Sequence, residues 1–234
     1  MKLDARRTLV VGLAMIIGIM PFVPLVRSLA FPVYLLNTHL HEFCHAVAAY
    51  LTGGYVDYIR VESDISGVTM LATRAPVVTA SAGYVGASII GALVVVASRT
   101  PRGAKIALYA LAACLLFSLT FWVRGSAVGV GIGILWVGLL VAGGTFLRGE
   151  TLAGVAQVVG LAQCFAAIMG VFELFKVAAA GEEAGDAANM AAYTGIPASI
   201  WMLLWAIASM ALAWMSLKRA WGVDQPEGSV RREP

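Results

Sequence analysis

The sequence predicts an all-α polytopic membrane protein, with about six to seven transmembrane helices and a short interfacial β-hairpin. Hydrophobic residues make up 60% of the chain and charged residues only 12%, whereas soluble domains average about 45–50% apolar and about 25% charged residues. Apolar runs of roughly 20 residues, the length that a spanning helix requires, recur from end to end. A soluble fold would lack the polar residues needed to cover its surface.

Seven apolar runs are long enough to cross a bilayer as helices. They are Leu9–Val26, Phe31–Leu51, Pro76–Ala97, Ile106–Val123, Ala127–Phe146, Leu152–Ala179 and Ser199–Leu217. We interpret the first run as a retained transmembrane helix, because Arg27 interrupts the stretch in which a signal-peptide cleavage site would lie. The second run carries a cluster of polar residues, so it must face the protein interior or a water-filled cavity.

Basic residues form short clusters between the apolar runs, a pattern that indicates membrane topology and argues against a nucleic-acid-binding face. The clusters that follow the third, fifth and seventh runs would share one side of the membrane, the cytoplasm. They are Arg102 with Lys105, Arg148, and Lys218 with Arg219. Seven alternating spans would place Lys2, Arg6 and Arg7 on the opposite side, so either the second run does not cross fully or one span is wrong. The sequence therefore leaves the orientation open.

The segment Gly53–Met70 predicts a β-hairpin at the membrane surface. Apolar and polar residues roughly alternate from Tyr55 to Val61, Ser66-Gly67 supplies a turn, and a strand-like run resumes at Val68. An irregular interfacial loop is the alternative.

We expect residues 1–220 to form a single membrane-embedded domain and residues 221–234 to form a polar C-terminal tail. No polar stretch is long enough for a PDZ-like domain. A second polar patch, Gly181–Pro197, ends in Gly-Ile-Pro, which fits a turn into the last helix.

Small residues indicate close packing within the chain. Gly125, Gly129 and Gly133 recur every four residues, a stripe that lets two helices approach closely. The three cysteines (Cys44, Cys114 and Cys164) are far apart in apolar runs, so we interpret them as packing residues and not as a disulfide framework.

All three histidines lie in the second run, within His39-Leu-His-Glu-Phe-Cys-His45. Residues four apart share a helix face, so His41 and His45 can bind one metal ion, while Glu42 can act as general base without ligating it. Two imidazoles and a carboxylate are costly in a membrane helix unless a metal compensates them. His39 points to the other side of the helix, where a hydrogen bond is its expected role, and we interpret Cys44 as a packing residue.

A catalytic zinc site needs a third protein ligand and an open position. The available carboxylates are Asp57, Glu62, Asp64, Glu150, Glu173, Glu182, Glu183 and Asp186. Asn37, one turn before His41, is a candidate oxyanion donor, although a helix hydrogen bond would also explain it.

The stretch His41–Thr69 (HEFCHAVAAYLTGGYVDYIRVESDISGVT) resembles the site-2 protease family of intramembrane zinc metallopeptidases. It is most similar to the small branch without a PDZ domain, in which HExxH is followed by a Thr-Gly-Gly turn and a short strand pair closing in Ser-Gly. The similarity continues in Ala80–Gly86, and in Gly185–Pro197 with the tryptophans that follow.

This resemblance implies a Zn²⁺ ion held by His41, His45 and an aspartate, with Glu42 as the base. The larger family supplies the aspartate from an Asn-Pro…Leu-Asp-Gly motif that this sequence lacks. Asp186, in Gly-Asp-Ala, is the closest match and the expected third ligand.

The expected function is that of a zinc metalloendopeptidase, integral and multi-pass in a bacterial plasma membrane, which hydrolyses peptide bonds of membrane-anchored protein substrates. The hairpin would act as a lid or as a strand partner for the substrate. One alternative is a non-proteolytic membrane protein that keeps the metal for structure, sensing or partner binding; Glu42 argues against it, because a structural site needs no base. Another is a transporter with a histidine-carboxylate ion site.

Overall fold

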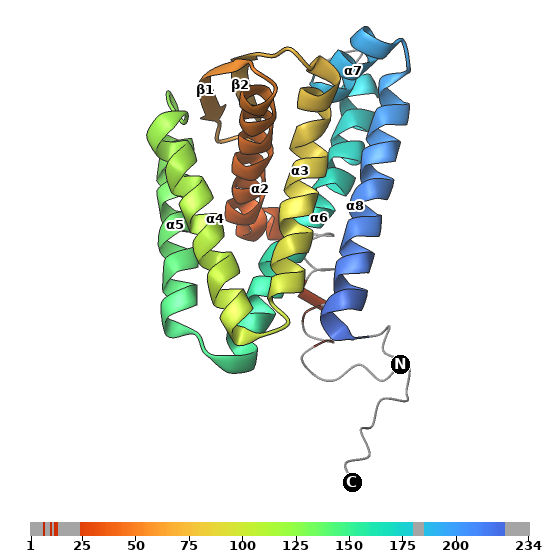
Figure 1. Ribbon diagram of the computed structural model, residues 1–234. Helices are drawn as coiled ribbons and strands as arrows, with labels where there is room; N and C mark the ends of the chain where they lie inside the picture. Colours follow the sequence, from red (N-terminus) through yellow and green to blue (C-terminus); the bar gives the residue numbers. More distant parts are fainter. Residues whose placement is uncertain (1–6, 8–9, 11, 14–23, 180–184, 223–234) are drawn as a thin grey trace.

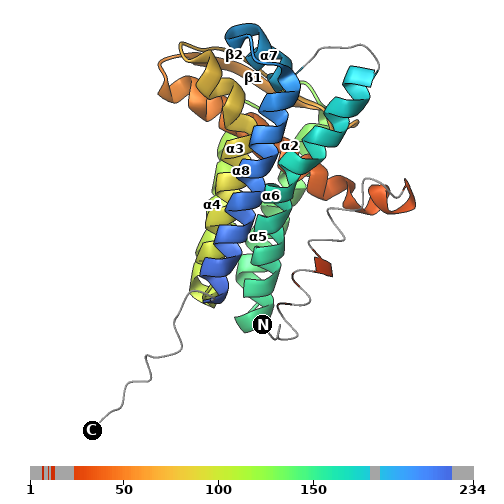
Figure 2. The ribbon, with the colours of Figure 1, turned by 90° about the vertical axis from the view of Figure 1, so that its right-hand side faces the viewer.

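Five long helices lie side by side in the described residues, and α2 crosses them obliquely (Figures 1 and 2). The computed structural model describes residues 7, 10, 12, 13, 24–179 and 185–222, and for 24–30 and 166–179 only the backbone. The helices are α2 (Pro24–Leu51), α3 (Pro76–Ala97), α4 (Pro101–Phe121), α5 (Ala127–Phe146), α6 (Gly149–Ala179), α7 (Asp186–Thr194) and α8 (Ala198–Trp221). Most of the predicted first helix, Leu9–Val26, and nearly all of the tail lie outside the described residues.

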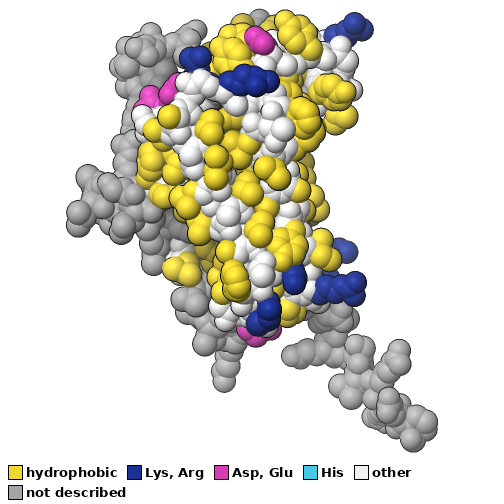
Figure 3. All heavy atoms as spheres, turned by 90° about the vertical axis from the view of Figure 1, so that its left-hand side faces the viewer, with side chains coloured by type: hydrophobic (Ala, Val, Ile, Leu, Met, Phe, Trp, Pro, Cys, Tyr) yellow, Lys and Arg dark blue, Asp and Glu magenta, His cyan; other side chains and the backbone are white. Residues whose placement is uncertain are grey.

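Four of the described helices, α3, α4, α5 and α8, are long and apolar enough to cross a membrane. On the face shown in Figure 3, hydrophobic side chains cover the middle of the molecule, and charged side chains gather at its two ends. This is the surface expected of a helix bundle in lipid. The total of six to seven spans stays a prediction.

Sequence prediction found the bounds of α3 and α5 and placed the start of α4 too late. We expected that helix to begin at Ile106, after the basic residues, but it begins at Pro101. The Thr100 side chain caps it by accepting a hydrogen bond from the backbone N–H of Gly103 (3.1 Å), and proline fits the first helical position. The cap and the proline therefore allow the helix to begin in the polar segment before Ile106.

The motif helix α2 is longer than predicted, because it runs unbroken from Pro24 and continues through Pro32. The expected break before Phe31 is wrong. A proline inside a helix leaves the carbonyl one turn earlier unpaired but does not always end the helix. Trp136 of α5 donates its indole N–H to the carbonyl of Pro32 itself (2.6 Å), which anchors this part of α2.

The predicted hairpin is confirmed as β1 (Tyr55–Val61) paired antiparallel with β2 (Gly67–Ala72). The predicted turn at Ser66-Gly67 is wrong by a few residues. The chain turns at Glu62–Ser66, where the Glu62 N–H donates to the Ser66 carbonyl (2.9 Å) and Ile65 adopts a φ of 79°. Gly67 is instead the first residue of β2.

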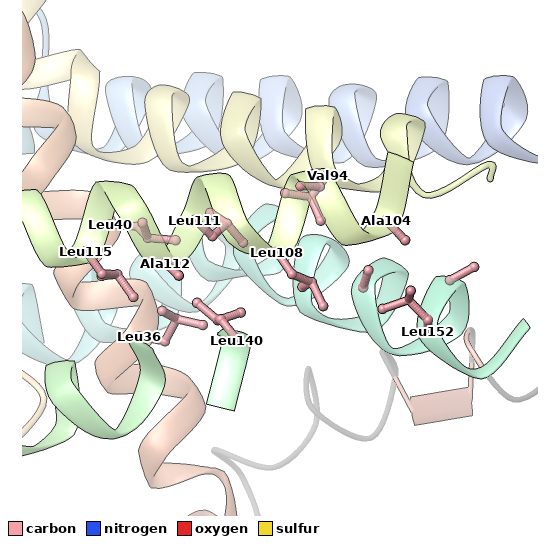
Figure 4. Packing of buried hydrophobic residues seen from close by; sticks show 13 residues of the cluster. Leu36, Leu40, Val94, Ala104, Leu108, Leu111, Ala112, Leu115, Leu140 and Leu152 are labelled. Atoms are coloured by element: carbon pink, nitrogen blue, oxygen red, sulfur yellow. The ribbon is translucent and has the colours of Figure 1, made fainter. Parts of the chain in front are cut away.

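The bundle core is built from leucine and alanine side chains of α2, α4, α5 and α6, together with Val94 of α3 (Figure 4). Two glycines of the predicted stripe, Gly129 and Gly133, lie in α5 and pack within the chain, whereas Gly125 precedes the helix with a φ of 80°. A Cβ at Gly129 would lie closer than 3.0 Å to the Val61 carbonyl of β1, and one at Gly133 would press on Leu119 of α4. These glycines let α5 approach the hairpin and α4.

The polar patch Gly181–Pro197, which we expected to form a turn into the last helix, contains a short helix, α7. Gly185 precedes it with a φ of 89° and Gly195 ends it with a φ of 72°, both in the region that favours glycine. Alanine and methionine between them suit a helix. Since α7 packs on α3 and α8, it brings Asp186 to the same end of the bundle as the hairpin (Figure 1).

Candidate active site

The side chains of His41, His45 and Asp186 converge on one point. The Nε2 atoms of the two imidazoles are 3.0 Å apart, and Asp186 Oδ2 lies 2.9 Å from that of His41 and 3.0 Å from that of His45. In a tetrahedral zinc site with Zn–N and Zn–O distances near 2.0–2.2 Å, ligand atoms are separated by about 3.3 Å. The three atoms are therefore spaced to within a few tenths of an ångström of what one zinc ion requires.

A hydrogen bond from Nδ1 of His45 determines that the Nε2 atom of the neutral ring directs a lone pair toward His41 and Asp186. Its Nδ1 lies 2.6 Å from the Thr79 carbonyl oxygen, which can only accept, so Nδ1 carries the proton. In neutral His45, Nε2 then presents a lone pair to the Asp186 carboxylate. Lone pairs at this distance repel, so the three atoms need either a metal cation between them or a proton on at least one of them.

Asp186 comes from the first turn of α7, 145 residues from His41 in the chain. Burial alone would raise the pKa of its carboxyl group, but the contacts with His41 and His45 hold that pKa below its ordinary value. The aspartate is thus a charged partner for the two imidazoles. Among the described residues, these three form the one group of histidine, cysteine and carboxylate atoms close enough to hold a metal ion.

The other proposed carboxylate ligands whose side chains the structure describes do not join this group. Asp57 and Asp64 are exposed on the hairpin and Glu62 is partly exposed, while Glu150 lies at the start of α6, on the opposite end of the bundle. The side chains of Glu173, Glu182 and Glu183 lie outside the described residues.

Glu42 is buried beside the imidazoles and held by the hairpin. Its Oε2 accepts a hydrogen bond from the Thr69 hydroxyl (2.7 Å), and the same hydroxyl contacts the Glu42 carbonyl (3.0 Å). Gly67 covers the other oxygen, since a Cβ at this position would lie 2.5 Å from Glu42 Oε1. Strand β2 therefore fixes the carboxylate of the predicted base.

Helix α3 supports the two histidines from the opposite side. A Cβ at Gly83 would lie closer than 3.0 Å to His41 Cε1 and to the Nε2 atoms of both histidines. One residue later, the Tyr84 ring meets His41 edge to face, with centroids 4.6 Å apart, and stacks on Trp205 of α8. Glycine at 83 thus lets α3 approach, and the aromatic pair limits rotation of the His41 ring.

A cleft of about 780 Å³ opens next to these side chains, between α2, the hairpin, the start of α3 and α7. Asn37, the candidate oxyanion donor, lines it and donates an amide N–H to Gln163 Oε1 of α6 (3.1 Å). The hydrogen-bonding role expected for Asn37 is thus confirmed, and its oxyanion role stays a prediction.

His39 and Cys44 lie away from the cluster, as expected. His39 is fully buried and its Nε2 is 2.9 Å from the Gly129 carbonyl of α5. Cys44 is also buried, and its Sγ would lie 2.8 Å from a Cβ at Gly86 of α3. Both residues pack α2 against its neighbours.

Four contributions to the site were not found from the sequence. Thr69 and the Thr79 carbonyl act through hydrogen bonds that span 27 and 34 residues, and every residue type has a carbonyl, so no local signal exists. Gly83 and Tyr84 lie in the glycine-rich block of α3 that carries part of the resemblance, but only the packed structure shows which glycine faces the histidines.

One of three comparisons with known proteins identifies the family of the chain. The search of curated proteins and that of solved structures returned no match. The sequence profile of the family described as Peptidase M50B-like matches residues 10–216, which is most of the chain and includes both the HExxH helix and Asp186. The resemblance to site-2 proteases is thereby confirmed, and the chain belongs to the Peptidase M50B-like family of membrane metallopeptidases.

Proposed function

We propose that this integral membrane protein is an intramembrane zinc metalloendopeptidase that hydrolyses peptide bonds of membrane-anchored protein substrates. The observation that carries the proposal is the convergence of His41, His45 and Asp186 to within 3.0 Å of one another, next to a buried glutamate. The proposal treats residues 1–220 as one membrane-embedded domain.

His41 Nε2, His45 Nε2 and Asp186 Oδ2 would hold the ion. The set matches zinc chemistry, in which two imidazoles and one carboxylate leave a fourth position open for catalysis. Zinc, when bound, supplies Lewis-acid polarisation of the scissile carbonyl and makes water more acidic at neutral pH. The Thr79 carbonyl holds His45 in the tautomer whose Nε2 lone pair faces the ion.

Glu42 would act as the proton carrier. Glu42 follows His41 in the chain, so it does not share the helix position of the two histidine ligands and remains free of the ion. Its carboxylate can therefore take a proton from water and pass it to the leaving amine. The Thr69 hydroxyl orients Oε2 (2.7 Å), and a carboxylate fixed in this way needs little reorganisation during the reaction.

The free edge of β2 would bind the substrate. The Ile59 backbone points away from β2, because its N–H donates to the Trp122 carbonyl (2.8 Å) and its carbonyl accepts from Arg124 N–H (2.9 Å). Its partner in the register, Thr69, must then direct its own N–H and C=O away from β1, to the other edge. No described strand covers that edge, and β2 lines the cleft. An extended peptide added there would lie next to Glu42.

The substitution Glu42→Gln tests the enzyme against its rival. It should lower peptide hydrolysis by about 10²–10⁴-fold, the range for loss of a general base, while zinc content stays near one ion per chain. A protein that keeps the metal only for structure, sensing or partner binding would bind zinc and show no hydrolysis that depends on Glu42. The absence of zinc from active wild-type protein would refute the metal assignment itself.

A further inference from the structure

Basic side chains are unevenly divided between the two ends of the bundle. The end that holds the α3–α4 and α5–α6 connections and the end of α8 is here called the basic end. Its described basic residues near helix termini are Arg99, Arg102, Lys105, Arg148, Lys218 and Arg219. The N-terminal Arg7 joins them, because its Nη2 donates to the Trp221 carbonyl at the end of α8 (3.1 Å).

The opposite end, which we call the site end, carries the hairpin, the α4–α5 connection and α7 (Figure 1). Its basic residues with described side chains are Arg60, Arg74 and Arg124, and the backbone of α6 brings Lys176 to this end as well. Asp57, Glu62, Asp64 and Asp186 offset this smaller number of positive charges. Figure 3 shows both charged ends separated by the apolar middle of the molecule.

The position of Arg7 removes the topology conflict that the sequence presented. Arg7 lies at the basic end, whereas α2 ends at Leu51 next to the hairpin, at the site end. Arg7 and Leu51 therefore lie at opposite ends, whereas two complete spans between them would have returned the chain to the end at which it started. Arg7 and the basic residues in the two connections and at the end of α8 then all lie on one side.

Lysine and arginine in short connections set the orientation of a polytopic protein, with the richer side in the cytoplasm, and acidic residues contribute little. The connections at the basic end meet this condition, since only three residues separate α3 from α4 and two separate α5 from α6. The basic end should thus face the cytoplasm.

We infer that the cleft with His41, Glu42 and His45 opens on the extracytoplasmic side of the membrane. Its substrates would be membrane-anchored proteins whose extracytoplasmic segment, next to their membrane span, enters the cleft in extended form along β2. The substrate class rests on the proposed function, whereas the orientation rests on charge and connectivity alone.

Cysteine labelling tests the orientation. Ser63→Cys adds a thiol to the exposed hairpin turn at the site end, and Thr151→Cys adds one to the exposed first turn of α6 at the basic end. Both variants are produced in a bacterial plasma membrane and treated with a membrane-impermeant maleimide. Wild type, with Cys44 and Cys164 buried and Cys114 partly buried, is the background control.

In intact cells, Ser63→Cys should be labelled and Thr151→Cys should be labelled only after the membrane is opened. The reverse pattern would overturn the inference. Labelling requires no activity, and Ser63→Cys combined with Glu42→Gln should label equally.

A pair of single-span reporters tests the substrate class. One carries a cleavable extended segment next to its span on the extracytoplasmic side, and the other carries the same segment on the cytoplasmic side. Cleavage of the first alone, abolished by Glu42→Gln, is expected. Cleavage of the second alone would overturn the substrate class, and outside labelling with neither reporter cleaved would count against the proposed peptidase while the orientation stands.

Discussion

Gly83 offers a sharp test of how the tertiary structure assembles the metal site, because its side-chain position is occupied by both histidine rings. In Gly83→Ala the added methyl group would lie closer than 3.0 Å to His41 and His45 atoms, whereas ordinary contacts begin at 3.4 Å. The rings or α3 must therefore shift by at least about 0.4 Å, and ligand distances in metal sites hold to within about 0.2 Å.

We expect Gly83→Ala to weaken zinc binding by at least about 10–100-fold, the cost of disturbing groups that orient metal ligands. Peptide hydrolysis should fall with zinc occupancy. The overpacking itself should lower the free energy of unfolding by about 1–3 kcal/mol, which is small beside the 5–15 kcal/mol of a typical domain, so the protein should still fold.

Zinc content of the purified protein, measured across a series of buffered zinc concentrations, and a thermal unfolding curve would check both expectations. Gly138→Ala is the matched control, since a Cβ there meets nothing within 4 Å and the residue is also helical. If Gly83→Ala binds zinc as tightly as wild type and retains full hydrolysis, the spacing of α3 does not determine the site and the reasoning fails.

Three further substitutions test separate parts of the structure. Thr69→Val removes the hydrogen bond to Glu42 Oε2. Since bonds to charged groups contribute about 1.5–3 kcal/mol, kcat should fall about 10–100-fold while zinc content stays unchanged, and Thr69→Ser should recover most of the lost activity. An unchanged kcat in Thr69→Val would exclude this role. Asp186→Asn should lower zinc occupancy, whereas Asp57→Asn on the exposed hairpin should not; equal zinc content in the two would exclude Asp186 as a ligand. Thr100→Ala removes the α4 cap. Tm should therefore fall by about 2–4 °C, equivalent to roughly 1 kcal/mol of stability, while hydrolysis is unaffected. A Tm equal to that of wild type would mean that the cap adds no stability.

The sequence by itself determined the features that depend on composition and on local geometry. Low charge and repeated apolar runs specify a membrane protein, because lipid selects composition along the whole chain. The spacing of His41 and His45 determines that their side chains share a face, because helical geometry fixes it within one turn. The hairpin was likewise visible, since alternation and turn chemistry are local, although the position of its turn was not.

Only the tertiary structure decided how the site is completed. Asp186 reaches His41 across 145 residues of chain. The family resemblance favoured it among eight candidate carboxylates, but no local property of the sequence places it beside the histidines. The absence of a Cβ at Gly83, the Thr69 hydroxyl on Glu42 and the end of the bundle at which the cleft opens follow from how α2, α3, α7 and the hairpin pack together. Packing joins segments that are distant in the chain, so no pattern within one segment could have revealed these contacts.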